Sequence, residues 1–163
     1  MSGPITSNIA SLPYTIIGTP RAIGVGSYAL VLKATEEARI DIGKLGQFAL
    51  KQGYYVYSGS ALGGLSARLA RHFRPGKRGH WHIDYLTAQL QIQETWIVLR
   101  SERLECLCAQ ALRSLPGAEV PIPGFGSSDC HCSTHLAYFS ALPSPHVFEQ
   151  ALLGLMQAAE RKR

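Results

Sequence analysis

The stretch between residues 53 and 82, GYYVYSGSALGGLSARLARHFRPGKRGHWH, constrains the fold of this chain more than any other stretch. Its aromatic and β-branched residues after Gly53 predict a strand over residues 54–58. After a glycine pair, apolar residues recur at helical spacing on one face and arginines on another: Leu65, Leu69 and Phe73 against Arg68, Arg71 and Arg74. We therefore expect a strand that leads into an amphipathic helix with an arginine-bearing face.

Further strands and helices are predicted on both sides of this stretch. Strands are expected over residues 26–33, 92–99 and a short run ending at Phe139, a hairpin over 39–42 and 47–50, and an edge strand over 14–17. Helices are expected over 80–90, 102–115 and from Ser144 to the C-terminus. Because strands and helices do not alternate regularly, this order predicts an α+β (mixed α/β) fold with a small antiparallel central sheet flanked by helices.

Length and composition fit one folded domain. A chain of 163 residues with 46% hydrophobic and 17% charged residues can bury a core and is too apolar to stay disordered. We expect an N-terminal arm over residues 1–21, rich in Ser, Pro and Thr, followed by a single domain over 22–163. No segment approaches the ~18 apolar residues of a membrane span. A cytoplasmic protein with no membrane partner and no obligate protein partner is expected.

The charge distribution favours an anionic partner. The net charge is +5 and the pI about 9.2. Basic and histidine side chains interleave over a short stretch: Arg68, Arg71, Arg74, Lys77 and Arg78, with His72, His80 and His82. A phosphate backbone is the partner that such a stretch attracts most strongly, so we expect nucleic acid, and DNA rather than RNA. The alternative is a solvated face that only confers solubility.

Several motifs resemble known families. Gly26-Ser-Tyr28, Tyr57-Ser-Gly59 and the arginine at position 68 on the following helix resemble the GIY-YIG nuclease fold. The longer segments GSYALVLK, GYYVYSGSALGGLSARLARH, HWHIDYL and FGSSDCHCSTHL resemble a small prokaryotic family labelled DUF123. This resemblance covers residues 26–139 and implies a GIY-YIG-like architecture.

The resemblance implies a metal-dependent endonuclease that hydrolyses phosphodiester bonds. The residues in matching places are Tyr28, Tyr57, Arg68 and Glu105. A guanidinium can clamp the charge that develops on phosphate oxygens, an ionised phenol can accept a proton from water, and a single carboxylate suits Mg²⁺ or Mn²⁺. His72 would bind phosphate or protonate the leaving oxygen, with His80 and His82 as rivals for that role.

Two alternatives follow from other residues. Serine replaces isoleucine in both short motifs, at Ser27 and Ser58, which favours a nucleic-acid-binding module that kept the scaffold and lost turnover. Cys130, Cys132 and His135 offer donors that bind Zn²⁺, with a fourth ligand among Asp129, His131, Cys106 and Cys108, which would suit a zinc-stabilised interaction protein. The same residues could also pack as an ordinary loop near the cleft.

Overall fold

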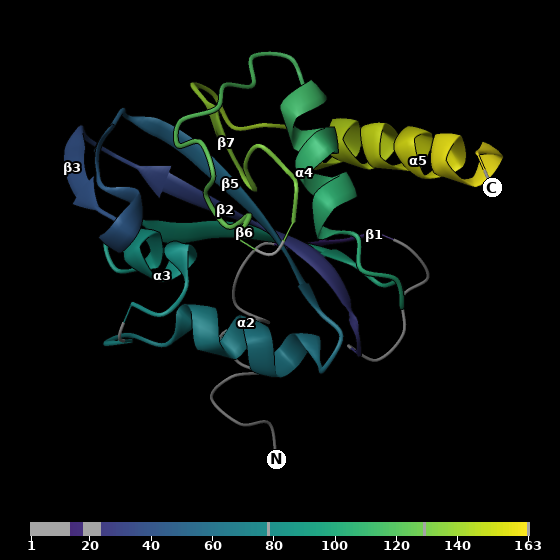
Figure 1. Ribbon diagram of the computed structural model, residues 1–163, viewed down its shortest axis with the longest axis horizontal. Helices are drawn as coiled ribbons and strands as arrows, with labels where there is room; N and C mark the ends of the chain where they lie inside the picture. Colours follow the sequence, from purple (N-terminus) through teal and green to yellow (C-terminus); the bar gives the residue numbers. More distant parts are fainter. Residues whose placement is uncertain (1–13, 18–23, 78, 129, 163) are drawn as a thin grey trace.

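A five-stranded sheet with helices on both faces forms the body of the protein (Figure 1). The computed structural model describes residues 14–17, 24–77, 79–128 and 130–162. In spatial order the strands are β1 (Tyr14–Ile17), β6 (Gln91–Val98), β2 (Gly26–Ala34), β5 (Gly53–Ala61) and β7 (Leu136–Phe139). All neighbours are antiparallel except β1, which pairs in parallel with β6. The predicted α+β fold is confirmed.

The two faces of the sheet bury separate hydrophobic clusters. On β2, Tyr28, Leu30 and Leu32 belong to one cluster, whereas Ala29 and Val31 belong to the other. This alternation follows from the two-residue period of a strand, and burial on both faces explains why β2 is apolar almost throughout. The run that predicted this strand is therefore the centre of the molecule.

Helices and one hairpin cover these clusters. The first face carries α2 (Leu65–Phe73), α3 (His82–Thr87) and a hairpin of β3 (Ala38–Asp41) and β4 (Gln47–Leu50), joined by the short 3₁₀ helix η1 (Gly43–Leu45). The second face carries α4 (Glu105–Ser114) and α5 (Pro145–Arg161). The end of α5 extends beyond the body of the protein (Figure 1). Helices on both faces agree with the prediction.

Two helices begin later than their periodicity predicts, and side-chain hydrogen bonds mark both starts. The Asp84 carboxylate accepts hydrogen bonds from the backbone N–H groups of His80 and Trp81, which places the start of α3 at His82. The N–H of Leu104 donates to Ser27 Oγ at 3.0 Å, just before α4 begins. The C-terminal helix starts as predicted, with Ser144 Oγ accepting from the N–H of Val147.

One strand end is left open. β7 pairs only with Tyr54–Tyr57, so residues 58–61 of β5, here called the open edge, pair with β2 on one side and have no described strand on the other. The start of α4 lies against this edge, since Ser58 Oγ donates to the backbone oxygen of Glu105 at 3.0 Å. The open edge is where the two faces of the sheet can contribute side chains to one place.

Parts of the predicted arm and two site residues lie outside the description. The expected edge strand over 14–17 is present as β1, but residues 1–13 and 18–21 of the arm are outside the described residues, as are Arg78 and Asp129. Among the described residues, no helix has the length and apolar character needed to cross a bilayer.

Candidate functional site

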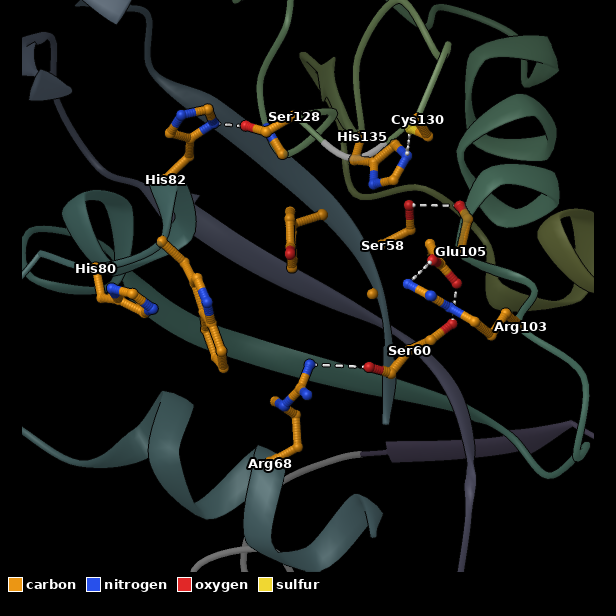
Figure 2. Close-up of a pocket in the computed structure, with 14 residues that line it drawn as sticks. Ser58, Ser60, Arg68, His80, His82, Arg103, Glu105, Ser128, Cys130 and His135 are labelled. Atoms are coloured by element: carbon orange, nitrogen blue, oxygen red, sulfur yellow. Dashed lines mark hydrogen bonds and ion pairs between the residues drawn. The ribbon is translucent and has the colours of Figure 1, made fainter. Parts of the chain in front are cut away.

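A cleft of about 560 Å³ opens beside the open edge of β5 (Figure 2). Seven of the residues predicted from sequence line it: Tyr57, Arg68, His80, His82, Glu105, Cys130 and His135. They come from β5, α2, the start of α3, the start of α4 and the loop before β7. Segments more than 70 residues apart in the sequence therefore meet around one cavity.

Arg68 and Glu105 are held on either side of Ser60. Arg68 Nη1 donates to the backbone oxygen of Ser60 at 2.8 Å, and Ser60 Oγ donates to Glu105 Oε2 (Figure 2). Arg103 Nη2 donates to the other carboxylate oxygen of Glu105 at 2.8 Å. The predicted cation and the predicted carboxylate thus face the same cleft, fixed through one residue of the open edge.

The carboxyl group of Glu105 is ionised. Partial burial would raise its pKa, but hydrogen bonds from Ser60 and Arg103 lower the pKa below its ordinary value. The Glu105 side chain is 14% exposed to solvent, so it is accessible from the cleft. An ionised, accessible oxygen donor is the kind of ligand that Mg²⁺ and Mn²⁺ take.

Tyr28 and His72 lie beneath the cleft rather than in it. Both are buried, and the Tyr28 hydroxyl is 2.6 Å from His72 Nε2. The ring centroids of Tyr28 and Tyr57 are 6.5 Å apart, and only Tyr57 reaches the cleft. His72 is therefore placed to act through Tyr28 and not by direct contact with a phosphate.

Burial sets the protonation of these groups. It raises the pKa of Tyr28 to about 12, against the opposing effect of Arg68, and raises the pKa of Tyr57 as well. It lowers the pKa of His72 to about 3. Desolvation outweighs the field of Arg68 at both tyrosines, so both phenols keep their protons in the free protein.

The basic residues of α2 divide into two groups. Arg71 makes two hydrogen bonds of 2.8 Å to the buried carboxylate of Asp84 and lies 3.8 Å from the centre of the Trp81 ring. Lys77 Nζ donates to backbone oxygens of His72 and Arg74, at the C-terminus of α2. Arg71 and Lys77 thus hold α2 in place, whereas Arg68 faces the cleft and Arg74 is exposed.

The two histidines at the start of α3 border the cleft. His82 Nδ1 accepts a hydrogen bond of 2.8 Å from the N–H of Gly126, and burial lowers the pKa of His82. At neutral pH the ring proton of His82 is therefore on Nε2, which can act as a donor. His80 is exposed.

Four metal-binding side chains gather beside the cleft. The ligand atoms of Cys106, Cys130, Cys132 and His135 all lie within 4.8 Å of one another. His135 Nε2 is 3.3 Å from Cys130 Sγ and 3.7 Å from Cys106 Sγ. Of the candidates for a fourth ligand, Cys106 is the one in place, while Cys108 is buried in the core and His131 is exposed. The cluster could hold a metal ion.

Comparison with known families finds one family that matches this chain. The family described as domain of unknown function DUF123 matches residues 27–157, which include every described site residue. The chain belongs to the DUF123 family. No curated protein and no solved structure matches it.

Several residues of the cleft in this DUF123 protein were not predicted as site residues from sequence, and three of them make contacts that shape it. Ser60, Arg103 and Trp81 all line the cleft. The Trp81 side chain packs against the hydrophobic core, and the centre of its ring lies 4.7 Å from the guanidinium of Arg68. The signal for Ser60 was its place in a polar alternation with Ser58 at the end of an otherwise apolar strand, which is unusual for a strand covered on both faces.

Proposed function

We propose that this DUF123 protein is a metal-dependent phosphodiesterase of the GIY-YIG type that cleaves nucleic acid as an endonuclease, with DNA as the expected substrate. The observation that carries the proposal is the convergence of Tyr57, Arg68 and Glu105 on one cleft, with Ser60 between the last two. The cations around this cleft are those that a phosphate backbone would meet.

The residues have separate roles in the proposed reaction. Arg68 keeps donors beyond its bond to Ser60, and these would bind the phosphoryl oxygens on which negative charge develops. Glu105 would hold Mg²⁺ or Mn²⁺, which when bound polarises the phosphoryl group and lowers the pKa of water. The Nε2–H of His82 would donate to a phosphate oxygen. Each role uses a donor or acceptor that already faces the cleft.

Tyr57 is the phenol that substrate can reach, so we assign to it the contact with the attacking water. Its hydroxyl is neutral in the free protein because burial raises its pKa. In the resting state it therefore orients the water by a hydrogen bond, and it can take the water's proton only after losing its own. Tyr28 supports Tyr57 from below and is hydrogen-bonded to His72.

The test is cleavage of labelled single-stranded, duplex and branched DNA and of RNA, with Mg²⁺ or Mn²⁺. We expect Arg68→Ala to slow cleavage by about 10²-fold or more, the usual cost of removing a transition-state donor. Arg74→Ala is the matched control, since Arg74 is an exposed arginine of the same segment that does not line the cleft. No cleavage by the wild type, or equal cleavage by Arg68→Ala, would contradict the proposal.

A second candidate is a nucleic-acid-binding module without turnover. The serines that motivated it have structural roles: Ser27 Oγ accepts from the N–H of Leu104, and Ser58 Oγ donates to the backbone oxygen of Glu105. Both therefore support the position of Glu105, which favours the catalytic proposal. Salt-sensitive binding that survives in Glu105→Gln, with no cleavage by the wild type, would instead support the binding module.

We also propose Zn²⁺ as the metal of the Cys106, Cys130, Cys132 and His135 cluster, because three thiols and an imidazole are donors that zinc prefers over Mg²⁺. A zinc-stabilised interaction protein without enzymatic activity is the third candidate. Zinc content without cleavage or nucleic-acid binding would favour it.

A further inference from the structure

We propose that the cluster of Cys106, Cys130, Cys132 and His135 is a closed zinc site whose role is to fix Glu105 and the opposite wall of the cleft. The positioning role rests on the proposed function. The zinc site itself does not, because it follows from the four side chains alone.

The spacing of the donors fits a tetrahedral ion. Zinc bonds of about 2.3 Å to sulfur and 2.0–2.1 Å to nitrogen place tetrahedral ligands roughly 3.4–3.8 Å apart. The distances of 3.3 Å and 3.7 Å from His135 Nε2 to two of the sulfurs are already in or next to that range, and all four ligand atoms lie within 4.8 Å of one another. Movements of about an ångström would complete the site.

Four protein ligands make this a structural site rather than a catalytic one. Catalytic zinc sites keep one position for water or substrate, whereas sites with four Cys and His ligands are closed. A closed zinc ion would not activate water in the cleft. The two sites therefore suit different metals. The carboxylate of Glu105 suits a hard cation such as Mg²⁺, and the thiols of the cluster suit zinc.

The ligands come from two segments that are far apart in the sequence. Cys106 is the second residue of α4, and the other three belong to the loop before β7. Ser58 joins the same two segments, because its N–H donates to the backbone oxygen of His135 at 3.0 Å and its Oγ donates to that of Glu105. A metal at the cluster would close a ring through Ser58, α4 and the loop.

This ring includes both walls of the cleft. Cys106 directly follows Glu105, so fixing Cys106 fixes the backbone from which the carboxylate extends. Cys130 and His135 themselves line the cleft, and the N–H of Gly126 in the same loop holds His82. The described residues of the loop, 121–128 and 130–135, contain turns but no helix or strand. Zinc would supply the rigidity that secondary structure does not.

Metal content and cobalt substitution test the site independently of any nuclease activity. We expect one zinc ion per wild-type chain and none in Cys106→Ser or Cys132→Ser. Cys108→Ala is the matched control on the same helix, since Cys108 is buried outside the cluster, and it should retain zinc. Replacement by Co²⁺ should give the visible absorption of a tetrahedral thiolate site. Substoichiometric zinc in the wild type, or full zinc in Cys132→Ser, would overturn the zinc site.

Amide hydrogen exchange tests the positioning role. Removing zinc from the wild type with a chelator should speed the exchange of the Ser58 N–H at least tenfold, because its acceptor on His135 is released. Stripped wild type also gives this readout if a cysteine variant does not fold. Unchanged exchange after complete zinc loss would overturn the role while leaving the site.

The two proposals fail in different ways. Cleavage that needs Mg²⁺ but is equally fast in zinc-free protein would support the nuclease and contradict the positioning role. Stoichiometric zinc with faster exchange on its removal, but no cleavage of any substrate, would confirm the site and contradict the nuclease.

Discussion

At the scale of single residues, Ser60 connects the groups that matter most. Its backbone oxygen holds Arg68 and its hydroxyl holds Glu105 and contacts Ser27 Oγ at 2.7 Å. No rule of spacing predicts this, because Arg68 and Glu105 are 37 positions apart and meet only once β5 has folded between α2 and α4. The residue types at the site were predictable from the sequence, but the residue that joins them was not.

Replacing Ser60 should affect the reaction more than the fold. In Ser60→Ala the backbone bond to Arg68 remains, while the carboxylate of Glu105 loses one of its two side-chain donors. We expect cleavage to slow by about tenfold, the lower end of the usual cost of losing such a supporting partner. Rates measured over a Mg²⁺ titration would check this, with the exposed Ser66→Ala on α2 as control. Equal rates in both variants would contradict it.

His72 should make stability depend on pH. Its pKa is about 3 in the folded protein, chiefly because of burial, and near 6.5 when unfolded, so between these values the unfolded chain binds more protons. Stability is therefore lost as pH falls below 6.5, by about 2 kcal/mol at pH 5 from this residue. The measurement is urea unfolding at pH 7 and pH 5.

The control for this pH dependence is His72→Gln, which can still bond to Tyr28 but does not titrate. Burial also lowers the pKa of His82 and of His135, so both proteins should lose some stability on acidification. The part due to His72 is the difference between the two losses, and no difference would contradict the prediction.

At the scale of elements, α2 and α3 are joined by a buried ion pair. Arg71 was predicted to bind nucleic acid, but its guanidinium is occupied by Asp84, whose side chain is 1% exposed. Burial would raise the pKa of Asp84, yet hydrogen bonds from Arg71 and from the N–H groups of Trp81 and His80 lower it to about 2. This pair sets how α3 packs against α2.

Removing one partner of that pair should be costly. In Arg71→Ala the Asp84 carboxylate stays buried without its cation, and we expect a loss of about 3 kcal/mol of unfolding free energy. Lys51→Ala breaks the exposed pair with Glu119 and should change stability little. Urea unfolding of the two variants checks the contrast, which would be wrong if both lost the same amount.

The elements also show where sequence reasoning succeeds. Strands and helices were predictable because their apolar periods are local, and the caps at Ser144 and the glycine before α2 are local as well. The start of α4 was not, because it depends on Ser27, which is 77 positions from its partner Leu104. The start of α3 depends on Asp84, which is only three residues from Trp81, so a local capping rule could have found it. The fourth ligand of the cluster, Cys106, is 24 residues from Cys130 and could be identified only from the fold.

At the scale of the whole molecule, β1 forms one edge of the five-stranded sheet. This strand pairs in parallel with β6 over Tyr14–Ile17, far in sequence from the antiparallel strands around it. β1 supplies hydrogen-bond partners to the backbone groups along that side of β6. Without β1 these groups would have to bond to water. The predicted N-terminal arm therefore contributes at least one element to the folded body.

Truncation measures how much β1 contributes to thermal stability. Deleting residues 1–17 should lower the thermal unfolding temperature, since the pairing with β6 is lost, whereas deleting residues 1–13 retains the strand and should lower it less. Differential scanning calorimetry of the two truncated proteins measures this. Identical unfolding temperatures would contradict a stabilising role for β1.

The open edge of β5 has a further consequence for self-association. Residues two apart in a strand direct their backbone groups to the same side, so the N–H of Ser58 and the carbonyl of Ser60 both face away from β2. These are the groups that an added strand from another molecule would use. Here His135 and Arg68 already occupy them. The contacts that arrange the cleft therefore also oppose the addition of a strand from another molecule at this edge, which is how a fibre would begin.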